Sequence, residues 1–331
     1  MINHKEKQIY SHKPNSFDEA FEMVQQGVDL VLKASPLIIR EYTTHLSKST
    51  GKLIRGVSLL TCSLEENGGI HQDAARFSAA VELIHLATLV HDDVIDNAEL
   101  RRGEMSLQKK YGKRTAVICG DYLLCAALAL AGQATDKDKY IQFDVPNHLN
   151  RVVLGELSQH VNNGNFDLSV FRYLKIISGK TAALFEASFY AGAILCEEDE
   201  SVIQKYARLG RYIGMIFQLN DDCMDFESTQ LVEKKPVQSD YEQDVVTLPL
   251  IHACKMVDGF KERVKAARLS RQEINEAVKK AGGLAYTYAV ATKYYKKSLA
   301  IIDQLSLSEE KNTRMVEILE KAYKKQPQAK E

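Results

Sequence analysis

The sequence predicts an all-α protein built as a single large helical bundle. Apolar residues recur every three or four positions over long stretches, with few clean period-two runs. The six prolines leave the blocks 37–145 and 147–235 free of a residue that breaks helices. With 331 residues, of which 45% are hydrophobic and 26% charged, the chain has the length for a large core and the composition of a soluble globular protein.

The individual helices are predicted from local spacing, and several are apolar nearly all round and therefore buried. The clearest helical segments are 18–35, 77–92, 172–195 and 200–222. Clusters of Gly, Asn, Pro and charged residues predict the turns between helices, at 66–69, 101–104, 162–165 and 234–240. We expect one domain over 1–331, with loosely ordered tails over about residues 1–15 and 324–331.

Composition also excludes several classes of protein. The 43 basic and 44 acidic residues give a net charge of −1, which argues against a nucleic-acid binder that works through bulk charge. The apolar segment 116–132 is short for a membrane span and contains Asp121, so a buried helix is favoured. The polar N-terminus shows no signal peptide, and the six cysteines form no C-x-x-C pair. We therefore expect a cytoplasmic protein with reduced thiols.

Two aspartate clusters carry the chemistry. In "LVHDDVIDNAELRRG", Asp92 and Asp96 share a helix face, whereas Asp93 points off that face. The D-D-x-x-D spacing returns at Asp221 and Asp225, again at the end of an apolar helix. One such motif is commonly a solvated helix end, but two copies favour a common role. Carboxylate oxygens suit Mg²⁺, which usually completes its shell with water and substrate phosphate.

Basic residues close to these motifs predict anion binding. Arg101 and Arg102 directly follow the first motif, and Lys52 and Arg55 are three residues apart. Lys180 and Thr181 lie in "ISGKTAALFEAS". Arg and Lys bind phosphate oxygens through charge-assisted hydrogen bonds. Each pair alone is more often surface charge, but together with two metal motifs they indicate one metal-bridged anion site and one made by bases alone.

At these motifs the chain resembles the trans-prenyltransferases, the polyprenyl diphosphate synthases, and most of all the catalytic subunits of hexaprenyl and heptaprenyl diphosphate synthases. The resemblance covers about 51–251. It includes, in family order, "GKLIR", "IHLATLVHDDVIDNAELRRG", "GDYLL", "LGELSQ", "GKTAALFEAS" and "TLPLI". The ordered set is specific, although no single piece is.

The resemblance implies helices around a deep central cavity and a Mg²⁺-dependent reaction in which isopentenyl diphosphate attacks an ionised allylic diphosphate. It assigns metal binding to Asp92, Asp96, Asp221 and Asp225. It assigns isopentenyl diphosphate binding to Lys52, Arg55, His85 and Arg102. It assigns the allylic diphosphate to Arg101, Lys180, Thr181, Gln218 and Lys235. Asp93 and Asp222, the middle carboxylates, are expected to support the metal site without binding the metal directly.

The resemblance also bears on product length and assembly. Family members stop elongation early with bulky residues four or five positions before the first motif, where this chain has Thr88 and Ala87. Small side chains there predict a product longer than farnesyl, and we favour hexaprenyl to octaprenyl. The expected primer is farnesyl or geranylgeranyl diphosphate. The expected assembly is a homodimer, or a heterodimer with a small subunit.

Three positions depart from the family pattern. Gly56 replaces the proline that usually follows the arginine of G-K-x-x-R-P, and a more flexible backbone there would loosen the site of Lys52 and Arg55. Gln238 replaces a glycine of the segment after the second motif, which bears on the role of Lys235. Cys223 lies on the wrong helix face for a metal ligand, so we expect a small core residue.

Three alternatives remain open. A terpene cyclase also ionises a diphosphate at an aspartate motif, but it does not need the second anion site. A di-iron bundle uses paired Glu-x-x-His motifs, and Glu82 to His85 is the single match. A catalytically impaired partner subunit would have lost its aspartates, and this chain keeps both motifs.

Overall fold

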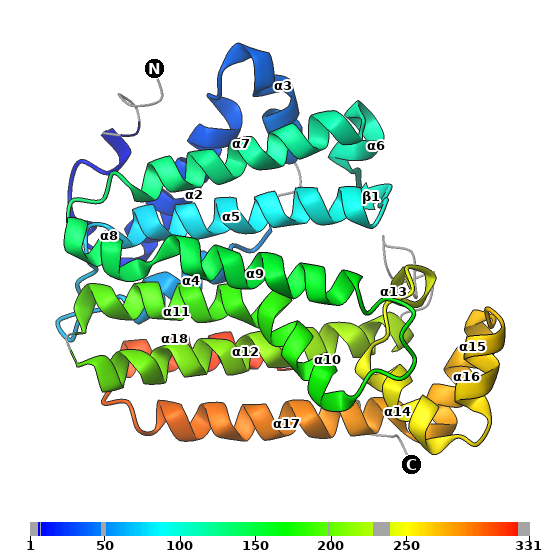
Figure 1. The fold of residues 1–331 in the computed structure, drawn as a ribbon. Coiled ribbons are helices and arrows are strands. Elements are labelled where there is room, and N and C mark those ends of the chain that lie inside the picture. The colour runs from blue at the N-terminus through cyan, green and yellow to red at the C-terminus, as the bar shows by residue number, and fades with distance from the viewer. Residues whose placement is uncertain (1–5, 7, 48–50, 198, 228–238, 324–331) are drawn as a thin grey trace. The chain divides into compact units, whose positions relative to one another are not determined.

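The computed structural model describes residues 6, 8–47, 51–197, 199–227 and 239–323, and Figure 1 shows their helices. The all-α prediction is confirmed, since the described elements are helices apart from one short hairpin and an isolated bridge. The residues cluster into two compact units. The first comprises Met1–Pro146, Glu186–Arg208 and Leu305–Met315, and the second comprises Asn147–Phe185, Leu209–Gln304 and Val316–Glu331.

The first unit is organised around α5 (Ala74–Ile95), against which α2, α4 and α7 pack. Figure 1 shows α5 and α7 running side by side. The other elements that lie wholly in this unit are α2 (Phe17–Lys33), α3 (Leu37–Leu46), α4 (Ile54–Cys62), β1 (Leu100–Arg101), β2 (Glu104–Met105), α6 (Leu107–Tyr111), α7 (Lys113–Ala131) and α8 (Lys137–Phe143). Residues from Ala74 to Ile84 of α5 are all buried, including the polar Arg76, Ser78 and Glu82.

Helix α7 is the one described helix with the length and apolar composition of a membrane span. It packs along α5 through buried residues that include Ala116, Cys119, Leu123 and Ala127. Val117 and Ile118 are exposed, so the buried helix predicted for this segment is buried on one side only.

Within the first unit, the chain before α2 contacts α5. Glu6 is buried, and its carboxylate lies 3.4 Å from Nη1 of Arg76 on α5. The Arg76 guanidinium lies 4.5 Å above the Tyr10 ring. Helix α2 then begins at the Ser16 cap, whose hydroxyl accepts the Glu19 N–H.

A tight hairpin follows the first aspartate motif. Strands β1 and β2 pair antiparallel, with Leu100 opposite Met105 and Arg101 opposite Glu104. The two turn residues, Arg102 and Gly103, have φ of 54° and 83°. This is the left-handed geometry of a two-residue hairpin turn, and it is uncommon for an arginine. The turn therefore holds the backbone of Arg102 in a conformation that residues with long side chains rarely adopt.

The second unit holds the other aspartate motif. The elements that lie wholly or mostly in it are α9 (Val145–His160), α10 (Val170–Ile177), η2 (Ser178–Ala182), α13 (Ser239–Glu242), α14 (Leu248–Met256), α15 (Phe260–Ala266), α16 (Arg271–Ala281) and α17 (Gly283–Ile302). Both units share α11 (Ala183–Cys196), α12 (Glu200–Glu227) and α18 (Glu309–Ala322). Helix α14 packs against α16 and α17, and Tyr173, Leu219 and Leu248 belong to the core.

The segment 172–195 differs from the single helix that the sequence predicts. It consists of α10, one π-helical turn over Ser178–Ala182, and α11. A Cβ on Gly155 of α9 would lie 2.2 Å from the Lys180 backbone nitrogen, so the two backbones approach as closely as glycine permits. Single π-turns often mark functional sites, and this one contains Lys180 and Thr181.

Candidate active site

The first aspartate motif lies at the C-terminal end of α5. Asp92 and Asp96 are partly exposed, whereas Asp93 between them is buried. Asp96 is the C-cap residue of the helix, and its N–H donates to the Asp92 carbonyl oxygen. The motif therefore separates its carboxylates into an accessible pair on one face and a buried one on another.

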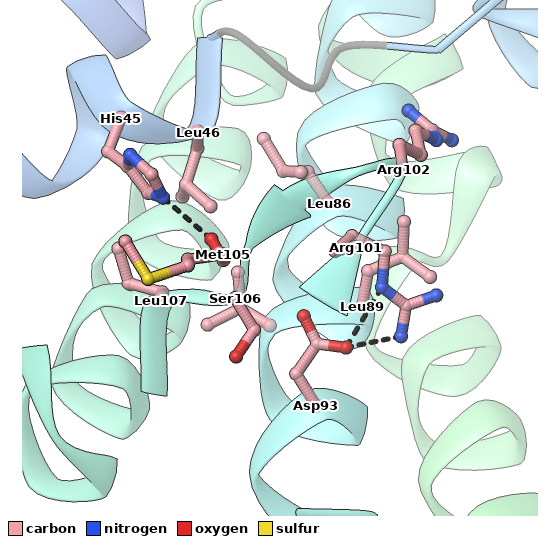
Figure 2. A pocket seen from close by; sticks show the side chains of 11 residues that line it. His45, Leu46, Leu86, Leu89, Asp93, Arg101, Arg102, Met105, Ser106 and Leu107 are labelled. Carbon is pink, nitrogen blue, oxygen red and sulfur yellow. Dashed lines mark hydrogen bonds and ion pairs between the residues drawn. The ribbon is translucent and has the colours of Figure 1, made fainter. Parts of the chain in front are cut away.

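The buried carboxylate holds one of the two hairpin arginines. Nε of Arg101 donates to Oδ1 of Asp93 at 2.9 Å, and Nη2 donates to the same oxygen. Figure 2 shows the Arg101 guanidinium turned towards Asp93, while the Arg102 guanidinium lies away from it. This pair lines a small pocket beside the hairpin, together with Leu86 and Leu89. Asp93 thus orients Arg101, a role that the sequence motif alone does not specify.

Arg102 packs against the glycine of "GKLIR". A Cβ on Gly51 would lie 2.5 Å from Nη2 and 2.6 Å from Nη1 of Arg102. Any larger residue at position 51 would therefore displace the guanidinium from this position. Lys52 is exposed immediately after it, and Arg55 is buried in the first turn of α4. The structure thus links the hairpin to this segment through Gly51 and Arg102.

Burial and neighbouring charges together shift the pKa values of Arg55 and His85 in this cluster. Burial lowers the pKa of Arg55 to about 10, the Glu82 carboxylate opposes this shift, and Arg102 adds to it. Burial holds the pKa of His85 well below its usual value, and Arg55 and Arg102 lower it further. His85 is therefore a neutral imidazole at physiological pH, able to donate one hydrogen bond to an anion but carrying no charge.

Glu82 belongs to this cluster, although sequence reasoning did not place it in a site. Its Oε1 accepts the Gly56 N–H at 2.7 Å. Burial raises the pKa of Glu82, opposed by bonds from backbone N–H groups and by the charges of Arg55 and Arg102. The match of Glu82 and His85 to a Glu-x-x-His motif could have drawn attention to it, but that pattern points to a metal rather than to this hydrogen bond.

The second motif repeats the division seen in the first. Asp221 is exposed and Asp225 partly exposed, whereas Asp222 is buried. The Tyr173 hydroxyl donates to Oδ2 of Asp222, and Nε2 of Gln218 donates to Oδ1 at 2.7 Å. Burial raises the pKa of Asp222 to about 7; these two bonds lower it, and Asp221 and Asp225 raise it.

A chain of hydrogen bonds continues from Asp222 to the π-helical turn. The Thr181 hydroxyl donates to Oε1 of Gln218 at 2.6 Å. Beside it, Nζ of Lys180 donates to Oε1 of Glu156 on α9 at 3.0 Å and lies 2.9 Å from its Oε2. Thr181, Gln218 and Asp222 are thus joined, and Lys180 is anchored from α9. Sequence reasoning missed Tyr173 and Glu156, although "LGELSQ" had pointed to the region of the latter.

The remaining sequence-based assignments have simpler outcomes. Lys235 and Gln238 lie outside the described residues. Ala87 is fully buried, and the partly buried Thr88 donates its hydroxyl to the His85 carbonyl oxygen at 2.8 Å. Cys223 is fully buried, which confirms the core position predicted for it, and all six cysteines are free thiols.

The outer carboxylates fit a hard divalent cation. They offer only oxygen donors, are accessible, and lie in pairs four residues apart on their helices. Among residues in the described part of the chain, no group of three or more His, Cys, Asp or Glu side chains is gathered closely enough to hold a metal. Mg²⁺ commonly takes one or two protein carboxylates and completes its shell with water and phosphate, so pairs of this kind are suitable.

Comparison with known proteins agrees with this chemistry. The polyprenyl synthetase family matches residues 36–284. Heptaprenyl diphosphate synthase component 2 of Geobacillus stearothermophilus is 32% identical over 295 residues, covering 86% of this chain and 90% of the relative. The corresponding Bacillus subtilis protein is 30% identical, covering 91% and 86%.

Solved structures show the same likeness. Heptaprenyl diphosphate synthase from Staphylococcus aureus is 30% identical with a TM-score of 0.84, covering 94% of this chain and 98% of that one. A Caulobacter crescentus polyprenyl synthase, solved with calcium and isoprenyl diphosphate, is 26% identical with the same TM-score and covers 92% and 94%.

These matches define the protein as an all-α prenyltransferase. The chain belongs to the polyprenyl synthetase family.

Proposed function

We propose that this prenyltransferase condenses isopentenyl diphosphate with an allylic diphosphate in the presence of Mg²⁺, releasing diphosphate and lengthening the prenyl chain. Its relatives include heptaprenyl and octaprenyl diphosphate synthases, which supports this reaction. We propose that the whole chain acts as one catalytic domain, because the family match covers residues from both compact units.

The observation that carries the proposal is the shared division within the two aspartate motifs. In each, the middle carboxylate is buried and bonded to protein donors, whereas the outer two are accessible. We therefore assign metal binding to Asp92, Asp96, Asp221 and Asp225. Asp93 and Asp222 are assigned to holding Arg101 and Gln218 in place.

The protein's own groups would bind and orient the substrates. Lys52, Arg55 and Arg102 would hold the diphosphate of isopentenyl diphosphate by charge-assisted hydrogen bonds, with neutral His85 donating one more. Arg101, Lys180, Thr181, Gln218 and Lys235 would contact the allylic diphosphate. Bound Mg²⁺ supplies charge neutralisation for the departing diphosphate. The fixed cations add to that stabilisation without needing to reorganise during the reaction.

Product length and assembly follow from narrower observations. The small, buried Ala87 and the small Thr88 are consistent with a chain longer than farnesyl. With heptaprenyl and octaprenyl synthases among the relatives, we propose a product of six to eight prenyl units from a farnesyl or geranylgeranyl primer. Because two relatives are named component 2, a heterodimer with a small subunit is proposed beside the homodimer. We propose a cytoplasmic location.

The alternatives are less well supported. A terpene cyclase does not need a second, metal-free anion site, which the cluster of Arg55, His85 and Arg102 would provide. A di-iron centre would use Glu82, but that carboxylate accepts backbone N–H groups instead. An impaired partner subunit is disfavoured because both aspartate motifs are intact.

The experiment is incorporation of labelled isopentenyl diphosphate into products with a farnesyl diphosphate primer. We expect turnover with Mg²⁺, none with EDTA, and none in D92A or D221A that retain wild-type circular dichroism. Asp258, an aspartate outside both motifs, provides the matched control D258A with unchanged turnover. Near-wild-type rates in D92A would overturn the metal assignment.

A further inference from the structure

Glu82 is a buried carboxylate for which the proposed reaction gives no direct task. It lies on α5 one turn before His85, is 6% exposed, and accepts the Gly56 N–H at 2.7 Å. The Arg55 N–H also donates to it. Both N–H groups belong to the first turn of α4, where backbone donors have no partner within the helix.

The residue at the N-cap position of α4 has no side-chain group that could satisfy these donors. The N-cap position of α4 is Leu53, which has φ of 49° and makes no side-chain cap. Caps are normally Ser, Thr, Asp or Asn. Glu82 therefore caps α4 from another helix, and its negative charge suits the positive end of the helix dipole. Because Arg55 lies in this first turn, the cap fixes the backbone from which its side chain extends.

Glu82 also acts on two arginines, the buried Arg55 and the exposed Arg102. Its charge attracts both Arg55 and Arg102, which repel each other. A fixed carboxylate beside them offsets the burial of the Arg55 guanidinium and the repulsion between the two cations. With the Arg102 guanidinium seated against Gly51, both arginines are held before any anion arrives.

Gly56 allows this arrangement. Proline, the usual residue here in the family, has no N–H to donate. A Cβ on Gly56 would lie 3.2 Å from Cγ and 3.5 Å from Oε1 of Glu82, so glycine also permits the close approach. The Ser78 hydroxyl donates to the Gly56 carbonyl oxygen at 3.2 Å. The glycine thus adds an anchor at the point where the sequence suggested a looser backbone.

We propose that Glu82 is a positioning residue for the isopentenyl diphosphate site, acting through the first turn of α4 and through Arg55 and Arg102, with Gly56 as its backbone partner. This inference rests on the proposed function of that site. It predicts the opposite change in anion affinity on removal of Glu82 from the change that a simple counter-charge role predicts. If Glu82 only neutralised the arginines, its removal would make the cluster more positive and strengthen anion binding, whereas loss of positioning weakens it.

The test compares variants in binding and in steady-state kinetics. Isothermal titration with inorganic pyrophosphate in EDTA probes the base-only anion site, and KM values for isopentenyl and allylic diphosphates separate the two sites in turnover. We expect E82A to weaken pyrophosphate binding at least tenfold and to raise KM for isopentenyl diphosphate at least tenfold. KM for the allylic substrate should stay within twofold.

Two further variants separate positioning from folding. E82Q keeps an oxygen acceptor for the two amides, so it should recover part of the affinity that E82A loses. G56P removes one donor without changing charge, and should weaken binding more than G56A, which keeps the N–H. The matched control is T61A, which removes a buried side-chain bond within α4 to the Val57 carbonyl oxygen and should leave affinity within twofold. If E82A does not fold, E82Q and G56P still show whether pyrophosphate affinity falls or rises.

Unchanged or tighter pyrophosphate binding in E82Q and G56P would overturn the positioning role. Absence of pyrophosphate binding by the metal-free wild-type protein would overturn it as well. If the wild-type protein binds pyrophosphate and the variants follow the expected order, but no condensation occurs with Mg²⁺, the positioning role stands and the proposed reaction fails.

Discussion

Replacing Gly51 with alanine directly tests the placement of Arg102. The new Cβ would lie 2.5 Å from Nη2 and 2.8 Å from Cζ of Arg102, whereas ordinary contacts begin near 3.4 Å. The guanidinium must therefore retreat by about 1 Å from its seat. A charge-assisted hydrogen bond to phosphate contributes about 1.5–3 kcal/mol, so its loss predicts roughly a 10- to 100-fold fall in kcat/KM.

The assay is steady-state condensation with each substrate varied in turn. We expect G51A to raise KM for isopentenyl diphosphate and to leave KM for the allylic diphosphate unchanged. The matched control is G68A in the loop before α5, where an added Cβ meets no atom within 4 Å. Gly68 has φ of 79°, so G68A should cost about 1 kcal/mol of stability without changing either KM. A G51A protein with wild-type KM for isopentenyl diphosphate would refute the assignment of Arg102.

Three further outcomes are expected. Y173F removes a donor to the buried Asp222 carboxylate, so it should lower the free energy of unfolding by about 1.5–3 kcal/mol in urea titrations. It should also raise KM for the allylic substrate. An unchanged allylic KM would contradict the proposed link from Asp222 through Gln218 to Thr181. Because the pKa of His85 is lowered, below pH 6.5 the unfolded chain binds a proton that the folded protein does not, so the free energy of unfolding should fall as pH falls. H85N should reduce the slope of the free energy of unfolding against pH by up to one proton. An equal slope in H85N would exclude a neutral His85 in the folded protein. T88F should shorten the product distribution when products are resolved by length, and an unchanged distribution would show that this position does not limit growth.

Much of the fold can be predicted from the chain's hydrophobic pattern. Helix α5 illustrates this, because its mostly apolar residues from Phe77 to Ile84 are all buried, although the polar Ser78 and Glu82 among them are buried as well. The π-helical turn over Ser178–Ala182 could not be predicted in this way. It coincides with a close approach of the backbones of Gly155 and Lys180, which are distant in sequence.

The site was predictable where its residues share one helix and not where they meet by tertiary contact. Asp92 and Asp96 are neighbours by helical spacing, so their shared face follows from the sequence. Glu82 meets Gly56 across 26 positions, and Tyr173 meets Asp222 across 49. A periodicity argument carries no information on such pairs, which is why both positioning groups were missed.

The same reasoning explains the outcome at Gly56. From sequence alone, glycine in place of proline suggests a more flexible backbone. The structure gives that backbone a hydrogen bond to Glu82 that proline could not form. The effect of the replacement therefore depends on which partner faces the N–H group, and only the tertiary structure shows that partner.

The central claim is that this chain elongates an allylic diphosphate. The most direct measurement incubates the purified wild-type protein with Mg²⁺, labelled isopentenyl diphosphate and farnesyl diphosphate, and resolves the products by length. We predict a discrete polyprenyl diphosphate of six to eight prenyl units, with one diphosphate released for each unit added. Consumption of farnesyl diphosphate to a hydrocarbon, with isopentenyl diphosphate left untouched, would contradict the claim and indicate a terpene cyclase.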